Sequence, residues 1–80
     1  MRGYELPDSV KRNPVGVQFA IETNNRTDSY TVIDIYTTVN QAGELVSRDL
    51  LCVNTFNGQR IESRKPVTTL LRSEIVSVPQ

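Results

Sequence analysis

The residues between Ser29 and Ser63 constrain the fold more than any other part of the chain, because they predict consecutive β-strands joined by short turns. The segment reads SYTVIDIYTTV, then NQAGE, then LVSRDLLCVNTF, then Asn57-Gly58, then QRIES. Asn-Gly is the strongest short hairpin signal, and Gly43 suits a turn position with positive φ. The segment therefore predicts a meander of antiparallel strands.

The remaining patterns extend this meander to five strands. Residues 15–22 alternate apolar and polar side chains, which is typical of a half-buried strand. The second strand, residues 29–39, is dense in the β-branched and aromatic residues that favour strands. In the third strand, residues 44–56, apolar residues occupy both odd and even positions, so a regular strand would turn them to both faces of the sheet. A bulge near Arg48-Asp49 is therefore predicted, because an inserted residue reverses the alternation of faces. Thr68 to Leu71 predicts a short 3₁₀ turn before the last strand. We expect the strands at residues 15–22, 29–39, 44–56, 59–64 and 73–78.

Eighty residues are enough for one small domain, which residues 15–80 would form. Residues 1–14 show no clear strand or helix period, so we expect a flexible arm. The alternative is a single helical turn that begins at Asp8 or Ser9, since either residue caps a helix well.

Composition narrows the setting of the protein. Nine basic residues balance nine acidic ones, so no overall field draws the chain to DNA or anionic lipid. The chain has no apolar run of membrane length, and its start is too polar for a secretory signal. Cys52 is the only cysteine, which fits a reducing compartment. We expect a cytoplasmic protein without a membrane partner, whose small core favours self-association or a protein partner.

The order of a strand, a long loop, two hairpins, a helical turn and a last strand resembles that of SH3-like barrels. Gly43, Asn57-Gly58 and the Pro66…Leu70…Ile75 ending carry this resemblance, which covers residues 15–78. The phrases YTVIDIYTT, GELV and PVTTLLR also resemble small proteins encoded on phages and plasmids. The resemblance implies an all-β, five-stranded SH3-like barrel and a mobile-element origin, but no activity.

Two families with this plan have known sites, and the sequence departs from both. Type II dihydrofolate reductases, which are oligomeric pore enzymes, use a Val-Gln-Ile-Tyr segment, whereas Gly58 to Glu62 here reads GQRIE. Peptide-binding SH3 domains line their groove with Ala-Leu-Tyr-Asp-Tyr and a tryptophan, and this chain has no tryptophan. We therefore favour an oligomeric pore enzyme less than a module that binds a protein or a module that binds nucleic acid, the two hypotheses set out below.

Residues for catalysis are scarce. The chain has no histidine, the commonest general base and a common metal ligand. Cys52 lies in the apolar run LLCVN, which predicts a buried, inert thiol. In a hairpin centred on Gln41-Ala42, Asp34 would lie directly opposite Asp49. Like charges at opposite positions are destabilising, so we expect either a bulge that shifts the register or an arginine that pairs with the carboxylates. We expect no enzyme, no catalytic residue, no cofactor and no metal site.

Two surfaces are candidates for binding. Tyr30, Val32 and Tyr36 share one face of the second strand, and as an exposed face they would suit a protein partner. This is the leading hypothesis, a non-catalytic interaction module. The alternative is a small barrel that binds nucleic acid through a basic patch of Arg60, Arg64, Lys65 and Arg72.

Overall fold

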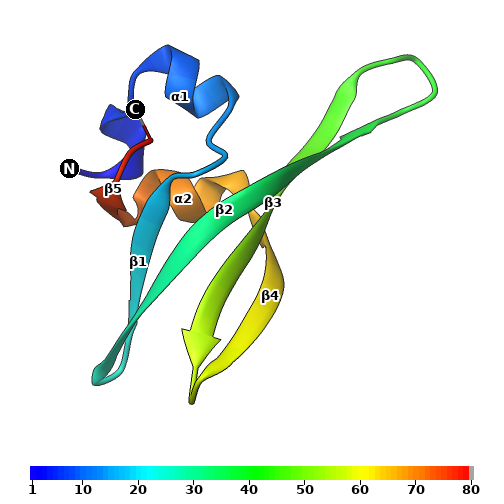
Figure 1. Cartoon of the computed structure of the whole chain (residues 1–80). Coiled ribbons are helices and arrows are strands. Elements are labelled where there is room, and N and C mark those ends of the chain that lie inside the picture. Colours follow the sequence, from blue (N-terminus) through cyan, green and yellow to red (C-terminus); the bar gives the residue numbers. More distant parts are fainter. Residues whose placement is uncertain (80) are drawn as a thin grey trace.

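The computed structural model describes residues 1–79, most of which lie in one antiparallel sheet. The strand order is β4-β3-β2-β1-β5, so the five expected strands are confirmed. β4 and β5 are the two edges and do not pair with each other, so the sheet remains open (Figure 1). In chain order the elements are η1 (Gly3–Glu5), α1 (Asp8–Arg12), β1 (Gln18–Thr23), β2 (Arg26–Val39), β3 (Leu45–Phe56), β4 (Gln59–Pro66), α2 (Val67–Arg72) and β5 (Glu74–Ser77).

Three tight turns connect the first four strands. Asn57 and Gly58 have φ of 51° and 76°, and Gly43 has φ of 79°, as the sequence predicts. The side-chain oxygen of Asn40 fixes the middle turn by accepting the N–H groups of Ala42 and Glu44, each at 2.9 Å. The long loop expected after the first strand is instead the two-residue turn 24–25, because Asn24 adopts φ of 47° and β2 begins early, at Arg26.

The pairing of β2 with β3 differs from the expected register. Asp34 lies opposite Leu51, and Tyr36 lies opposite Asp49, so the two carboxylates do not face each other. Two features cause this difference. The turn closed by Asn40 and Glu44 has three residues rather than two, and Val46 is an unpaired bulge residue; the longer turn and the bulge each shift the register by one residue. A second bulge lies at Ile33 on β2. The bulge that the parity change predicts near Arg48-Asp49 is the one at Val46, two positions before Arg48.

The core forms between one face of the sheet and α2. Phe19 on β1 stacks against Tyr30 on β2, with ring centroids 5.6 Å apart. We call this side of the sheet the core face and the opposite side the outer face. The fully buried apolar cluster consists of Val17, Phe19, Val32, Leu50, Cys52 and Leu70. Cys52 is therefore buried as predicted.

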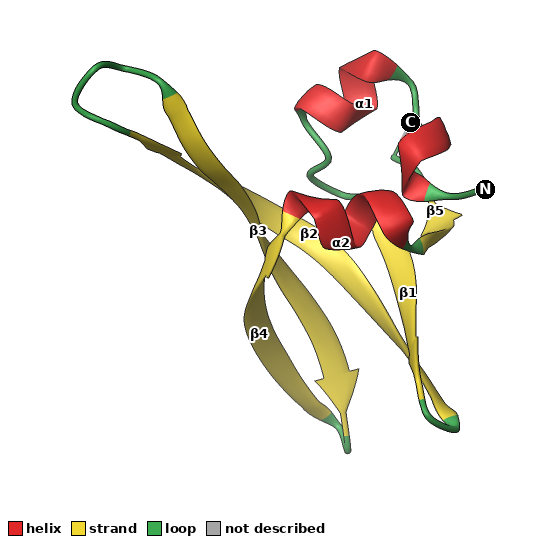
Figure 2. Cartoon of the chain, turned by 180° about the vertical axis from the view of Figure 1, so that it is seen from behind, coloured by secondary structure: helices red, strands yellow, loops and turns green. Residues whose placement is uncertain are grey.

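The segment before the last strand is an α-helix rather than a 3₁₀ turn. α2 spans Val67–Arg72 and lies across the sheet (Figure 2). Pro66 ends the edge strand β4, and its fixed φ of −65° leads directly into the helix. Leu70 anchors the helix because its side chain is buried in the core cluster. Burial of this face explains why the helix extends beyond the expected four residues.

Residues 1–14, expected as an arm with a helical turn as the alternative, form η1 and α1 and pack against α2 and β5. The N–H of Gly3 donates to the Ser73 carbonyl oxygen at 3.0 Å. Leu6 and Pro14 are buried. A Cβ atom at Gly3 would overlap the backbone of Leu70, so only glycine permits this approach. α1 begins at Asp8, after Pro7 in the cap position.

Candidate interaction surface

The hairpin of β2 and β3 extends beyond the rest of the sheet. β1 pairs with β2 only as far as Thr31, and β4 pairs with β3 only from Asp49 onward. Residues 37–48, which we call the β2–β3 arm, therefore form a two-stranded ribbon that projects from the body (Figures 1 and 2). This projection gives the chain extents of 43 × 25 × 25 Å.

Apolar side chains are exposed near the tip of the β2–β3 arm. The exposed fractions of Val39, Leu45 and Val46 are 56%, 64% and 62%. Single exposed apolar residues are ordinary, but here Val39 pairs with Leu45 and Val46 is its neighbour, so apolar side chains are concentrated near the tip. The ribbon gains no stability from a third strand here, because none pairs with it among residues 1–79.

A charged and aromatic cluster lies at the base of the β2–β3 arm, on the outer face. The Arg64 guanidinium stands 4.1 Å above the Tyr36 ring, and its Nε lies 3.7 Å from Asp49 Oδ2. The register of the strands brings the three residues together. Tyr36 pairs with Asp49 across β2 and β3, and Arg64 pairs with Leu51, which lies two positions after Asp49 on the same face of β3. Asp49 thus pairs with an arginine, as expected. Tyr36 stays exposed, so the cluster presents an aromatic ring held in place by a cation.

The three residues predicted to share an exposed face do not share one. Val32 is buried in the core, and Tyr30 stacks on Phe19 with the Lys65 Nζ 4.7 Å above its ring. The bulge at Ile33 is the reason, because an inserted residue reverses the alternation of faces after it. Tyr36 alone therefore points outward, which corrects the expectation of a common Tyr30/Val32/Tyr36 surface.

The four cations predicted to form a basic patch are dispersed. Arg60 pairs with Glu62 at 2.7 Å, and Arg64 belongs to the Tyr36 cluster. Lys65 lies on the core face, since it pairs with the buried Leu50, and Arg72 ends α2. Successive residues on a strand point to opposite faces, so Arg64 and Lys65 are separated by the sheet itself.

A different cation, Arg48, contacts the backbone at the end of α1, beside the basic residues Lys11 and Arg12. The Arg48 guanidinium donates to the carbonyl oxygen of Lys11 at 3.2 Å and also to that of Arg12. These contacts join the end of α1 to β3 across 36 and 37 positions of sequence. No local pattern indicates such a grouping, which is why sequence reasoning missed it.

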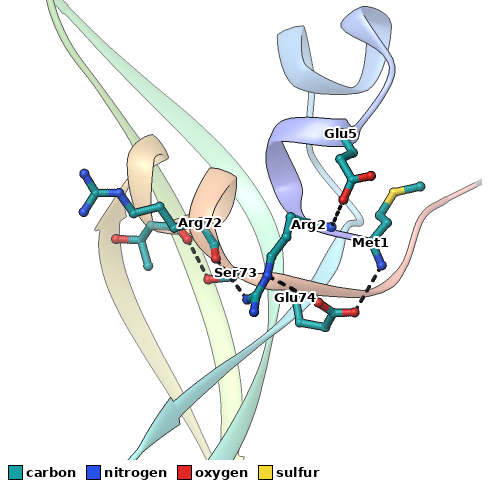
Figure 3. A network of polar contacts seen from close by, with 7 residues as sticks. Met1, Arg2, Glu5, Arg72, Ser73 and Glu74 are labelled. Atoms are coloured by element: carbon teal, nitrogen blue, oxygen red, sulfur yellow. Dashed lines mark hydrogen bonds and ion pairs between the residues drawn. The ribbon is translucent and has the colours of Figure 1, made fainter.

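A small cleft of about 330 Å³ lies where β1, β2 and β5 meet the first residues of the chain. Arg2, Ala20, Glu22, Thr27 and Glu74 line it. Glu74 contacts both the α-amino group of Met1, at 3.1 Å, and Arg2, at 3.7 Å (Figure 3). Arg2 also donates to the Arg72 carbonyl oxygen. The polar groups of this cleft thus join the start of the chain to α2 and β5.

Within residues 1–79 no three side chains of the His, Cys, Asp or Glu type are grouped closely enough to hold a metal ion. In the same residues no helix has the length and hydropathy needed to cross a membrane. Comparison of the chain with models of protein families, with curated proteins and with solved structures gives no match. Function must therefore be inferred from the geometry of the described residues.

Proposed function

We propose that this chain is a non-catalytic interaction module that binds a protein partner through the β2–β3 arm and the Tyr36 ring at its base. The projecting ribbon with exposed Val39, Leu45 and Val46 is the observation that carries this proposal. An apolar ribbon that no other strand covers gains stability when a partner buries it. Tyr36 adds an aromatic anchor with a polar tip.

We further propose that the fold is an incompletely closed SH3-like barrel from a phage or plasmid. A continuous order from β5 through β1, β2 and β3 to β4, with a helix before the last strand, supports the first part. The sequence phrases that resemble mobile-element proteins support the second part. Dispersal of Arg60, Arg64, Lys65 and Arg72 gives the nucleic-acid alternative less support.

Capture of partners by the tagged protein from its own host tests the proposal. Val46→Asp places a charge on the arm, whereas Val76→Asp makes the same change at a valine of β5 that is 54% exposed. Partners retained by the wild type and by Val76→Asp should be lost with Val46→Asp and weakened with Tyr36→Ala. Retention of every partner by the folded Val46→Asp and Tyr36→Ala proteins would refute the proposal.

A further inference from the structure

One long stretch of β2 has no neighbour on the side away from β3. The N–H of Val32 donates to the Val17 carbonyl oxygen at 3.0 Å, and Gly16 donates to the Val32 carbonyl oxygen at 2.8 Å. In the part of the chain that the structure describes, no strand continues this pairing beyond Val32. We call the stretch Ile35–Val39 on this side the free edge of β2.

The orientation of the backbone along the free edge follows from two hydrogen bonds. The N–H of Asn40 donates across the hairpin to the Glu44 carbonyl oxygen at 2.9 Å. In an antiparallel strand every second residue directs its backbone groups to the same side, so the backbone groups of Thr38 and Tyr36 also face β3. Val39, Thr37 and Ile35 then direct their backbone groups outward. Ile35 agrees with this, since its N–H donates to the Asp34 carboxylate at 2.8 Å rather than to β3. Thr37 and Val39 are left with outward N–H groups, a template for another strand.

The free edge lies beside the cationic side chain of Arg48, which contacts the end of α1. Thr37 pairs with Arg48, so both side chains lie on the core face, and Arg48 contacts the Lys11 and Arg12 carbonyl oxygens. None of these three cations forms an ion pair with a carboxylate in residues 1–79. The positive charge of Arg48, which no described carboxylate pairs, therefore stands beside Thr37, and the basic residues Lys11 and Arg12 follow at the end of α1.

We propose that an extended acidic segment of the protein partner adds to the free edge of β2 as a further strand. Antiparallel addition would satisfy the outward groups of Thr37 and Val39. The partner residue opposite Thr37 would project on the core face, toward Arg48 and the end of α1, and there a glutamate or aspartate is favoured. This inference rests on the proposed function and names the chemistry of the partner.

Other occupants fit these observations less well. A second copy paired symmetrically about Thr37 would bring two sets of Lys11, Arg12 and Arg48 together on one face, where they repel each other. Nucleic acid would meet the cations but could not extend the ladder of backbone hydrogen bonds. An acidic polypeptide satisfies both the charge and the edge.

Titration of the ¹⁵N-labelled protein with two short peptides tests the inference. One alternates valine with glutamate, and the other replaces glutamate with lysine. The glutamate peptide should shift the amide resonances of Thr37 and Val39 and bind about tenfold more tightly than the lysine peptide. Equal affinities, or shifts confined to other strands, would overturn the inference.

Two variants separate the backbone contribution from the charge. Thr37→Pro removes one outward N–H, which an edge strand tolerates, and Thr37→Ala keeps it as the matched control. Affinity for the glutamate peptide should fall about fivefold to tenfold with Thr37→Pro and change little with Thr37→Ala. Lys11→Gln combined with Arg12→Gln leaves β2 unchanged and should weaken the same peptide roughly fivefold. Wild-type affinity in the charge variant would contradict the inference even if Thr37→Pro failed to fold.

Two further measurements test the other possible occupants of the free edge. Sedimentation without peptide tests for a second copy of the chain, and titration with oligothymidine tests for nucleic acid. A dimer that Thr37→Pro converts to a monomer would show that a second copy occupies the edge, and oligothymidine binding that Thr37→Pro leaves intact would show a nucleic-acid site. Either result overturns the inference. A natural partner lost with Val46→Asp but kept with Thr37→Pro would also overturn it, and would leave the proposed function standing.

Discussion

Cys52 shows how burial sets the chemistry of a single side chain in this fold. It lies opposite Val32 in the ladder and is fully buried. Burial raises the pKa of the Cys52 thiol above its ordinary value of 9.0, and the nearby Lys65 opposes this more weakly. The neutral thiol, which is a poor nucleophile, is thus favoured over the thiolate in the folded state.

The raised pKa of Cys52 predicts a loss of stability in alkali. A group whose pKa is higher in the folded state contributes stability below its unfolded pKa, and that stability is lost as pH rises through the folded pKa. The free energy of unfolding, measured by urea denaturation, should therefore fall as pH rises above about 9. Cys52→Ala should lack this part of the decline, so identical pH profiles for the two proteins would count against a buried thiol.

Leucine residues in different surroundings give a matched test of the core. Leu70 is buried beneath α2, whereas Leu45 is exposed on the β2–β3 arm. Leu70→Ala should lower the free energy of unfolding by about 2–5 kcal/mol, since it leaves a cavity. Leu45→Ala should change it by less than about 0.5 kcal/mol. Comparable losses in urea denaturation would show that α2 does not pack as described.

Among the elements, the docking of η1 and α1 depends on Gly3. Gly3→Ala should displace the first residues from Leu70 and lower the free energy of unfolding by about 1–3 kcal/mol. Trypsin should then cleave after Lys11 and Arg12 more rapidly than in the wild type. Tyr4→Ala changes an exposed neighbour and serves as the control. Unchanged cleavage in Gly3→Ala would mean that this segment does not require the close contact.

The elements that short-range chemistry determines could be predicted from the sequence. Gly43 and Asn57-Gly58 require positive φ, so both of their turns were placed correctly. The docking of residues 1–14 depends on a contact between Gly3 and α2, which are far apart in the sequence, and no local period reports it. The length of α2 likewise depends on tertiary burial of Leu70.

The candidate site was less predictable because bulges decide which side chains face out. The insertion at Ile33 directs Tyr36 outward and leaves Tyr30 and Val32 in the core. β-branched residues occur throughout this strand, so composition does not mark the position of the bulge. The grouping of Arg48 with Lys11 and Arg12 is a tertiary contact and leaves no local signal.

At the scale of the whole molecule, the chain consists of a small packed body and a ribbon that extends from it (Figure 1). Two cation–π contacts link strands on the core face of the body. Arg26 on β2 lies 4.0 Å from the ring centroid of Phe56 on the neighbouring β3, and Lys65 on β4 lies over Tyr30 on β2. Beyond Tyr36 and Asp49, the hairpin of β2 and β3 has no cation–π contact among the described residues. In the function proposed above, the body provides stability and the arm provides the binding surface.

Hydrogen exchange of the backbone amides along β2 tests this division most directly. If the arm is an ordered ribbon with a free edge, the amides of Tyr36 and Thr38, which face β3, should exchange slowly. Those of Thr37 and Val39, which face solvent, should exchange rapidly. Rapid exchange at all four amides would show that no ordered arm exists. Slow exchange at Thr37 and Val39 in the isolated protein would show that the edge is already covered.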